Sequence, residues 1–164
     1  MRTLVALVED KPGTLNRISS LFRRRAFNIE SLTVGHTERE GMSRMTIVVD
    51  GTRTDSTMVE KNLRKLVNVS SVEDVTEQSA VLHELALIKV RTGPGRRSEV
   101  MQVVEAMGGR VIDIGLETLL VEVTGADDKI DRLLSVLRPF GIAEMTRTGR
   151  VAMVREAGAT AVPE

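Results

Sequence analysis

The chain has 164 residues, with 23 Lys and Arg against 23 Asp and Glu, so its formal net charge is zero at pH 7. This balance provides no overall field for nucleic acid or an anionic membrane, and no window approaches the roughly 20 apolar residues of a membrane span. The absence of Cys, Trp and Tyr excludes disulfides, thiolate metal sites and cysteine nucleophiles, and argues against aromatic base stacking as a mode of binding. We therefore expect a cytoplasmic protein that binds neither nucleic acid nor membrane.

The first half of the chain opens on an apolar strand that ends in the turn Lys11-Pro12-Gly13. Apolar residues at Ile18, Leu21 and Phe22 follow this turn with the i, i+3, i+4 spacing of one helix face. The remaining strands and the second helix follow in alternation. We expect strands over 4–8, 28–37, 42–50 and 71–77, and helices after Gly13 and over 56–67.

The second half repeats this plan. Aligning Pro12-Gly13 with Pro94-Gly95 places Val100, Val103 and Val104 on the apolar helix positions of the first half. A later helix has acidic residues at its start and Pro139 as its stop, as the helix dipole and proline geometry favour. We expect strands over 85–90, 110–115, 118–124 and 142–147, the last continuing as far as 154.

Each half therefore has the predicted element order βαββαβ, which is the ferredoxin-like fold of an antiparallel sheet with two helices on one face. The predicted fold class is α+β. We expect one domain over 1–78, a second over 79–155, and a disordered tail over 156–164. Most strands are apolar on both sides, so the helix-free face of a sheet needs a cover. The other half of the chain or a second copy would supply it, and we expect at least a homodimer.

Catalytic motifs are absent from the sequence. It contains no G-x-S-x-G elbow, no P-loop and no G-x-G-x-x-G, and its two histidines, His36 and His83, lack the spacing of a zinc-binding helix. We therefore expect neither catalytic residues nor a metal site.

Two basic segments leave alternatives open. Arg23 to Arg25 end the first helix, where cations favour the dipole, so a solvated helix end or a subunit contact is favoured over nucleic acid. The segment Gly93 to Arg97 resembles an anion cradle, with free amides at a helix start beside two guanidiniums, but it matches no known phosphate motif.

The turn before the first helix has the chemistry of an amino-acid site. The amides of Gly13, Thr14 and Leu15 are early donors for a carboxylate, and Gly13 has no side chain to block a ligand. Asp10 lies just before them as an acceptor for an ammonium, and Asn28 adds a side-chain amide. The alternative, which this chemistry leaves open, is that Asp10 and Asn28 only cap turns.

The second half provides an internal control for this site. At the aligned positions Asp10 becomes Thr92 and Asn28 becomes Arg110. The Pro-Gly turn and the apolar helix positions are repeated in the second half, but the polar residues are not. The fold itself therefore does not require Asp10 and Asn28.

Two stretches carry a resemblance to a known family. The segments VEDKPGTLNRISSLFRRRAFNIESLTVG and SRMTIVVDG closely resemble the N-terminal ACT domain of the small, regulatory subunit of acetohydroxyacid synthase, also called acetolactate synthase. The resemblance covers nearly the whole chain, and its N-terminal motifs are the more specific. It implies an effector-binding ACT domain over 1–78 and an ACT-like domain over 79–155.

The resemblance implies a function that composition does not show. Such subunits have no activity alone and no cofactor of their own. They bind a catalytic large subunit that uses thiamine diphosphate, Mg²⁺ and FAD, raise its activity, and confer feedback inhibition by branched-chain amino acids, usually valine. Arg23 to Arg25 are a candidate contact for the large subunit.

The resemblance also implies where the effector binds, between the ACT domains of two chains. Residue by residue, the effector-binding set carried over to this sequence is Asp10, Gly13, Thr14, Leu15, Asn28, Ile29, Val34 and Gly35. Many members have Asn where this chain has Asp10, which leaves the response to valine open. Apolar Ile29 and Val34 would select valine over smaller amino acids, since a methylene or two in such a pocket changes binding by about 1–3 kcal/mol.

Two rival functions remain. One is an amino-acid-sensing ACT protein that regulates a different enzyme. The other is a DNA- or RNA-binding regulator on a ferredoxin-like fold, which the even charge balance argues against.

Overall fold

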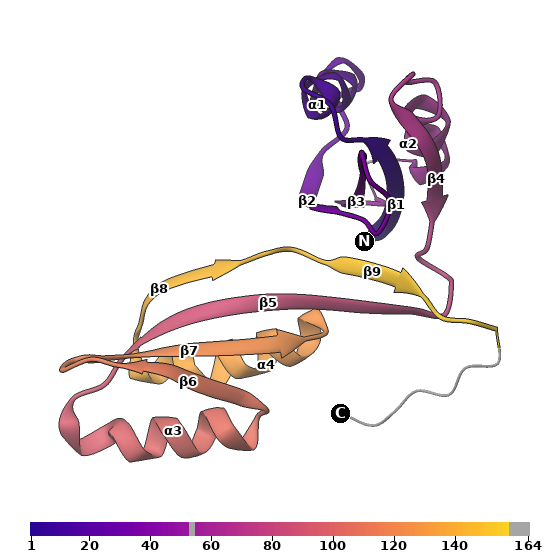
Figure 1. Cartoon of the computed structure of the whole chain (residues 1–164). Coiled ribbons are helices and arrows are strands. Elements are labelled where there is room, and N and C mark those ends of the chain that lie inside the picture. The colour runs from indigo at the N-terminus through magenta and orange to yellow at the C-terminus, as the bar shows by residue number, and fades with distance from the viewer. Residues whose placement is uncertain (53–54, 158–164) are drawn as a thin grey trace. The chain divides into compact units, whose positions relative to one another are not determined.

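The computed structural model describes residues 1–52 and 55–157 (Figure 1). The chain divides into two compact units, which are described separately. The first consists of Met1–Val81 together with the segment that begins at Arg150, and the second is Leu82–Gly149.

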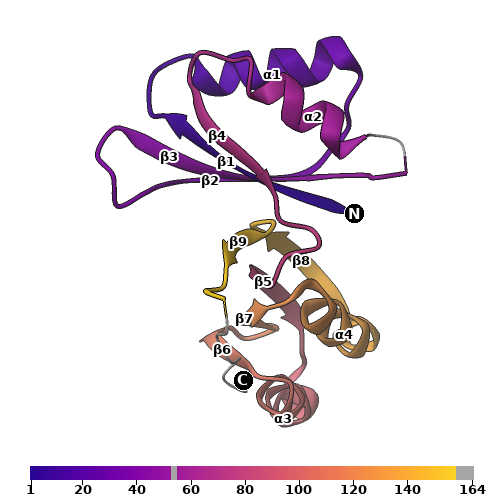
Figure 2. The ribbon, with the colours of Figure 1, turned by 90° about the vertical axis from the view of Figure 1, so that its right-hand side faces the viewer.

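The first unit is built on a four-stranded antiparallel sheet in the order β2-β3-β1-β4. Its two helices, α1 and α2, lie on one face of this sheet (Figure 2). Alternate residues of the two central strands, such as Ala6 and Ile47, are buried against the apolar faces of these helices, including Ile18 and Leu63. The elements are β1 (Arg2–Glu9), α1 (Thr14–Arg25), β2 (Ile29–His36), β3 (Met42–Val49), α2 (Ser56–Leu63) and β4 (Val69–Asp74).

The second unit repeats this arrangement, with the sheet order β6-β7-β5-β8. Its core joins Ile88 and Val121 of the central strands to Val104 and Leu133 of the helices. The elements are β5 (Ala80–Arg91), the 3₁₀ turn η1 (Pro94–Arg96), α3 (Arg97–Ala106), β6 (Gly109–Ile114), β7 (Thr118–Gly125), α4 (Asp127–Leu137), the 3₁₀ turn η2 (Arg138–Phe140) and β8 (Ile142–Arg147). The predicted α+β class with two ferredoxin-like βαββαβ halves is confirmed.

The end of the described chain differs from the expected continuous strand. Residues 142–154 form two strands, β8 and β9 (Val151–Val154), separated by a turn in which Gly149 has a φ of 80°. This left-handed conformation suits glycine and interrupts the strand. Strand β9 pairs with β5 and groups with the first unit, so the second unit ends before the boundary expected at 155. Of the tail predicted over 156–164, residues 158–164 lie outside the described part.

One helix and one strand of the first unit also have shifted boundaries. Helix α2 ends at Leu63 and not at 67, and β4 covers Val69–Asp74 and not 71–77. The reason is a pair of tight turns, in which the amide of Leu66 donates to the carbonyl of Leu63 and that of Val69 to Leu66, both at 3.0 Å. The apolar spacing continues past Leu63, but the hydrogen bonding of a helix does not.

Strand β9 lies on the helix-free face of the first sheet. Arg150 donates to the hydroxyl of Thr3 and Arg44 to the carbonyl of Ala152, each at 3.2 Å, and Ala152 is only 5% exposed. Val5 and Val48 on this face are buried. Strand β9 of the same chain therefore supplies part of the cover that the apolar strands require, while the homodimer stays a prediction.

Candidate functional site

The turn between β1 and α1 leaves a helix start open to a ligand. Gly13, at the N-cap, has a φ of 89°, and no other atom lies within 4 Å of the position that a Cβ would take, so it is both left-handed and unobstructed. No side chain caps this end, and the first turn contains no acidic residue. The first amides of a helix have no intrahelical acceptor, so this end can receive an anion such as a carboxylate.

The predicted donors at this turn are not equivalent. The amide of Thr14 donates to the carbonyl of Lys11 at 3.2 Å, so it is not a free donor as the sequence suggested. Its side chain is only 6% exposed, and its hydroxyl is buried without a hydrogen-bond partner among the described residues. Leu15 is half exposed. The turn thus combines an uncapped helix start with an unsatisfied buried hydroxyl.

Asp10 lies beside this turn with its carboxylate accessible. Its amide donates to the carbonyl of Gly41 at 2.8 Å, which fixes the backbone, while its Oδ2 is 3.1 Å from Nδ1 of His36. The neighbouring carboxylate of Glu9 already accepts hydrogen bonds from Asn68 and Lys11, and these hold the pKa of Glu9 below its usual range. Asp10 is therefore the carboxylate of this turn that faces solvent for an ammonium.

The contact between His36 and Asp10 was not predicted from the sequence, which suggested no partner for His36. The strand order β2-β3-β1 explains the contact. Strands β2 and β1 both run antiparallel to β3, so their last residues lie at the same end of the sheet. This order brings residue 36 to residue 10, and the spacing of the two residues along the chain does not predict it.

Val34 and Gly35 lie near the same end of the sheet. Both are exposed on the edge strand β2, and nothing lies within 4 Å of the position that a Cβ of Gly35 would take. Val34 and Gly35 lie two residues and one residue before His36, and they pair with Met45 and Arg44 of β3. They lie toward the same end of the sheet as Asp10, Gly13, Thr14 and Leu15.

Asn28 and Ile29 lie at the opposite end of the sheet. Ile29 pairs with Val49, which in turn pairs with Arg2, whereas His36 pairs with Ser43 near the end of β1. Seven residues of strand separate the two ends by roughly 20 Å. Asn28 donates its side-chain amide to Glu30, and Ile29 packs against the core. A single chain therefore does not bring the whole predicted set together.

Comparison with known proteins identifies both units. Residues 4–71 match the family model of the small subunit-like ACT domain of AHAS, and residues 83–156 match that of the small subunit of acetolactate synthase. An acetolactate synthase small subunit of Mycobacterium leprae is 51% identical over 153 residues, which cover 93% of this chain and 90% of that protein. One of Bacillus subtilis is 44% identical over 156 residues, covering 94% and 90%.

The chain belongs to the family of acetolactate synthase small subunits. A solved structure agrees with this assignment. The acetolactate synthase small subunit of Thermotoga maritima superposes with a TM-score of 0.85 at 39% identity, covering 94% of this chain and 97% of that one. The predicted family is confirmed, and a small subunit implies a catalytic large subunit as its partner.

In the second anion-binding candidate, the segment 93–97, both arginines contact other residues of the same chain. Arg96 lies 4.2 Å from the ring centre of Phe140 and contacts Glu99 at 3.3 Å. Arg97 donates to the carbonyls of Gly115 and Leu116 at 2.8 and 2.9 Å. Both side chains have structural roles, so the segment 93–97 is a weaker site than the turn at Gly13.

The described residues contain neither a metal-binding cluster nor a membrane-spanning helix. They contain no group of three or more His, Asp or Glu side chains arranged to hold a metal ion. Among the same residues, no helix has both the length and the apolar character needed to cross a membrane.

Arg23 to Arg25 are exposed in the last turn of α1, as expected.

Proposed function

We propose that this chain is the regulatory subunit that raises the activity of the catalytic large subunit of acetolactate synthase and makes it sensitive to valine. It would act in the cytoplasm, in branched-chain amino acid biosynthesis. The membership of both units in the small-subunit family supports the regulatory role. The uncapped start of α1 beside the accessible carboxylate of Asp10 supports an amino-acid effector.

The effector site that we propose is shared by two copies of the chain. One copy offers the helix start at Gly13 to the carboxylate of valine and Asp10 to its ammonium. A second copy supplies Asn28 and Ile29, because these residues lie at the other end of the sheet in a single chain. This division between chains is the reason to expect a homodimer or a larger assembly.

Regulation then follows from the position of the effector. Valine that contacts two copies holds them in one arrangement, and that arrangement favours a less active state of the large subunit. A coupling free energy of about 1–3 kcal/mol between the two sites is enough for regulation of several-fold to more than a hundredfold. The thiamine diphosphate, Mg²⁺ and FAD that we expect belong to the large subunit.

The test combines binding and activity. We expect valine to bind the isolated chain saturably by calorimetry, with alanine weaker, and to inhibit a complex reconstituted with the large subunit and its cofactors. Asp10→Ala should weaken valine binding about tenfold or more, because a charged hydrogen bond contributes about 1.5–3 kcal/mol. Glu38→Gln, which removes an exposed carboxylate that pairs with Arg39, is the control and should bind normally.

Two outcomes would contradict parts of this proposal. Unchanged valine affinity in Asp10→Ala would show that this carboxylate does not hold the ammonium. Failure of the chain to bind any acetolactate synthase large subunit would favour the alternative, an amino-acid sensor for a different enzyme.

A further inference from the structure

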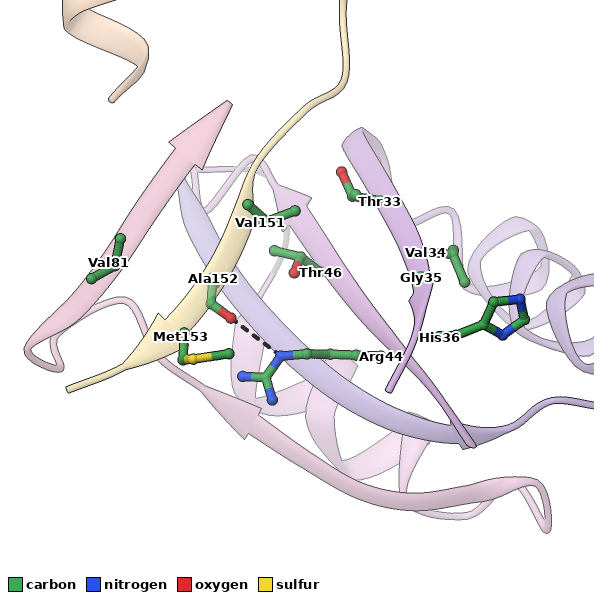
Figure 3. Close-up of a pocket in the computed structure, with 10 residues that line it drawn as sticks. All are labelled: Thr33, Val34, Gly35, His36, Arg44, Thr46, Val81, Val151, Ala152 and Met153. Carbon is green, nitrogen blue, oxygen red and sulfur yellow. Dashed lines mark hydrogen bonds between the residues drawn. The ribbon is translucent and has the colours of Figure 1, made fainter. Parts of the chain in front are cut away.

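The first unit contains a cavity that the proposed effector site does not explain. It has a volume of about 410 Å³, within the range of about 300–1,000 Å³ that is typical of small-molecule sites. It lies on the helix-free side of the sheet, between β2 and β3 on one side and β9 on the other (Figure 3). Alternation along β3 explains the placement, because Met45 and Ile47 point to the core and Arg44 and Thr46 to this side.

Most of the cavity wall is apolar. Val81 of β5 and Val151, Ala152 and Met153 of β9 form one side, and Thr33 and Gly35 of the edge strand β2 contribute to the other. Val151 and Met153 are 51% and 65% exposed, so apolar surface stays in contact with solvent. Burial of this surface by an aliphatic group would be favourable.

Arg44 is the cation of this cavity. Its Nε donates to the carbonyl of Ala152 at 3.2 Å, which orients the guanidinium toward β9 (Figure 3). Among the described residues, its two terminal nitrogens have no hydrogen-bond or ion-pair partner, and no Asp or Glu lines the cavity. Because the guanidinium is held through Nε, its two terminal nitrogens can donate in parallel to the two oxygens of a carboxylate.

We propose that this cavity binds a short aliphatic carboxylic acid that has no amino group. The carboxylate pairs with the terminal nitrogens of Arg44, and a branched chain of a few carbons lies among Val81, Val151 and Met153. The absence of an acidic lining residue among those described separates this site from the turn at Asp10, because nothing here compensates an ammonium.

The experiment is a calorimetric titration of the full chain with 3-methyl-2-oxobutanoate and 3-methylbutanoate. We expect saturable binding of at least one of the two acids with one site per chain. The uncharged 3-methylbutan-1-ol should bind at least tenfold more weakly, because it cannot pair with the guanidinium. Equal binding of the alcohol, or no binding of either acid, would overturn the proposal.

Variants separate the cavity from other sites. Arg44→Gln should weaken acid binding about tenfold or more, and Arg44→Lys should retain part of it. Because Arg44→Gln also alters the contact with β9, Val151→Phe provides an independent test, since the larger side chain fills the cavity from a half-exposed position. Val154→Phe, on the same strand but outside the lining, is its matched control. Unchanged binding in both Arg44→Gln and Val151→Phe would overturn the assignment.

Competition with valine distinguishes the two sites, which share Val34 and Gly35 in their surroundings. We expect acid binding to persist in the presence of saturating valine and in Asp10→Ala. Displacement of the acid by valine would place both ligands in one site and overturn the inference of a separate one. The proposed valine regulation would stand in that case, so the two proposals fail by different results.

Discussion

Ala26 ends α1 in a conformation that L-residues with a Cβ rarely adopt. Its φ of 54° is the one positive value among the described residues other than glycine, and its amide closes the helix by donating to the carbonyl of Arg23. A Cβ in this region costs roughly 1–2 kcal/mol, part of which the greater freedom of glycine in the unfolded chain would offset.

We therefore expect Ala26→Gly to raise the free energy of unfolding by about 0.5–1 kcal/mol. Ala26 is exposed, so the substitution removes no packing. Urea unfolding followed by circular dichroism measures the change. Ala106→Gly, at the end of the regular helix α3, is the control and should have the opposite sign, and a loss of stability in both variants would contradict the strain argument.

Individual site residues were only partly predictable. The Pro-Gly turn was sufficient to place Asp10 and Gly13 together, because the constraint acts within a few residues of the chain. The contact of Asp10 with His36 and the hydrogen bond of Thr14 to Lys11 depend on the strand order and on the local path of the turn. Neither leaves a pattern in residue types, so the sequence predicted neither of them.

Asp74 connects several elements of the first unit. Burial alone would raise the pKa of its carboxyl, but hydrogen bonds from the hydroxyl and amide of Thr76 and from Ser56, with the charge of Arg2, outweigh burial and lower it. Thr76 in turn accepts a hydrogen bond from the amide of Thr3 at 2.9 Å. One carboxylate thus joins the end of β4 to the start of α2 and to β1.

The lowered pKa has a consequence for acid stability. A carboxyl with a folded-state pKa below its unfolded value stabilises the fold above the unfolded pKa, and this contribution is lost as the pH falls through the folded pKa. We expect Asp74→Asn to be less stable near neutral pH and to lose less stability than the parent below about pH 4. Urea unfolding over a pH series measures this difference. Asp113→Asn, an exposed position, serves as control, and parallel curves for Asp74→Asn and the parent would contradict the prediction.

At the level of elements, the sequence was more informative. Apolar spacing and the two Pro-Gly turns predicted the helices and strands of both halves in their correct order. Helix α2 was predicted too long because Leu66 continues the apolar spacing while its amide forms a turn with Leu63. Strands β8 and β9 were merged in the prediction although Thr146 to Arg150 separate their apolar residues, and the left-handed conformation of Gly149 interrupts the strand.

The first unit depends on residues from both ends of the chain. Ala152 of β9 is 5% exposed, whereas its neighbour Met153 is 65% exposed. We expect Ala152→Leu to lower the free energy of unfolding by about 1–3 kcal/mol, because the larger side chain does not fit the buried position, and Met153→Leu to change it by less than about 0.5 kcal/mol. Urea unfolding of both variants tests this, and equal effects would show that β9 is not held against the sheet.

This arrangement has a consequence for the order of events during synthesis. Among the described residues, β9 is translated after every other strand, yet it covers a face that Thr3 and Thr46 present in strands made much earlier. The whole second unit is translated in between, which takes several seconds at about 5–20 residues per second. The nascent first unit therefore exposes this sheet face until residues 150–154 have been made. Its helices and four-stranded sheet emerge first, and its cover is added only after the second unit has been translated.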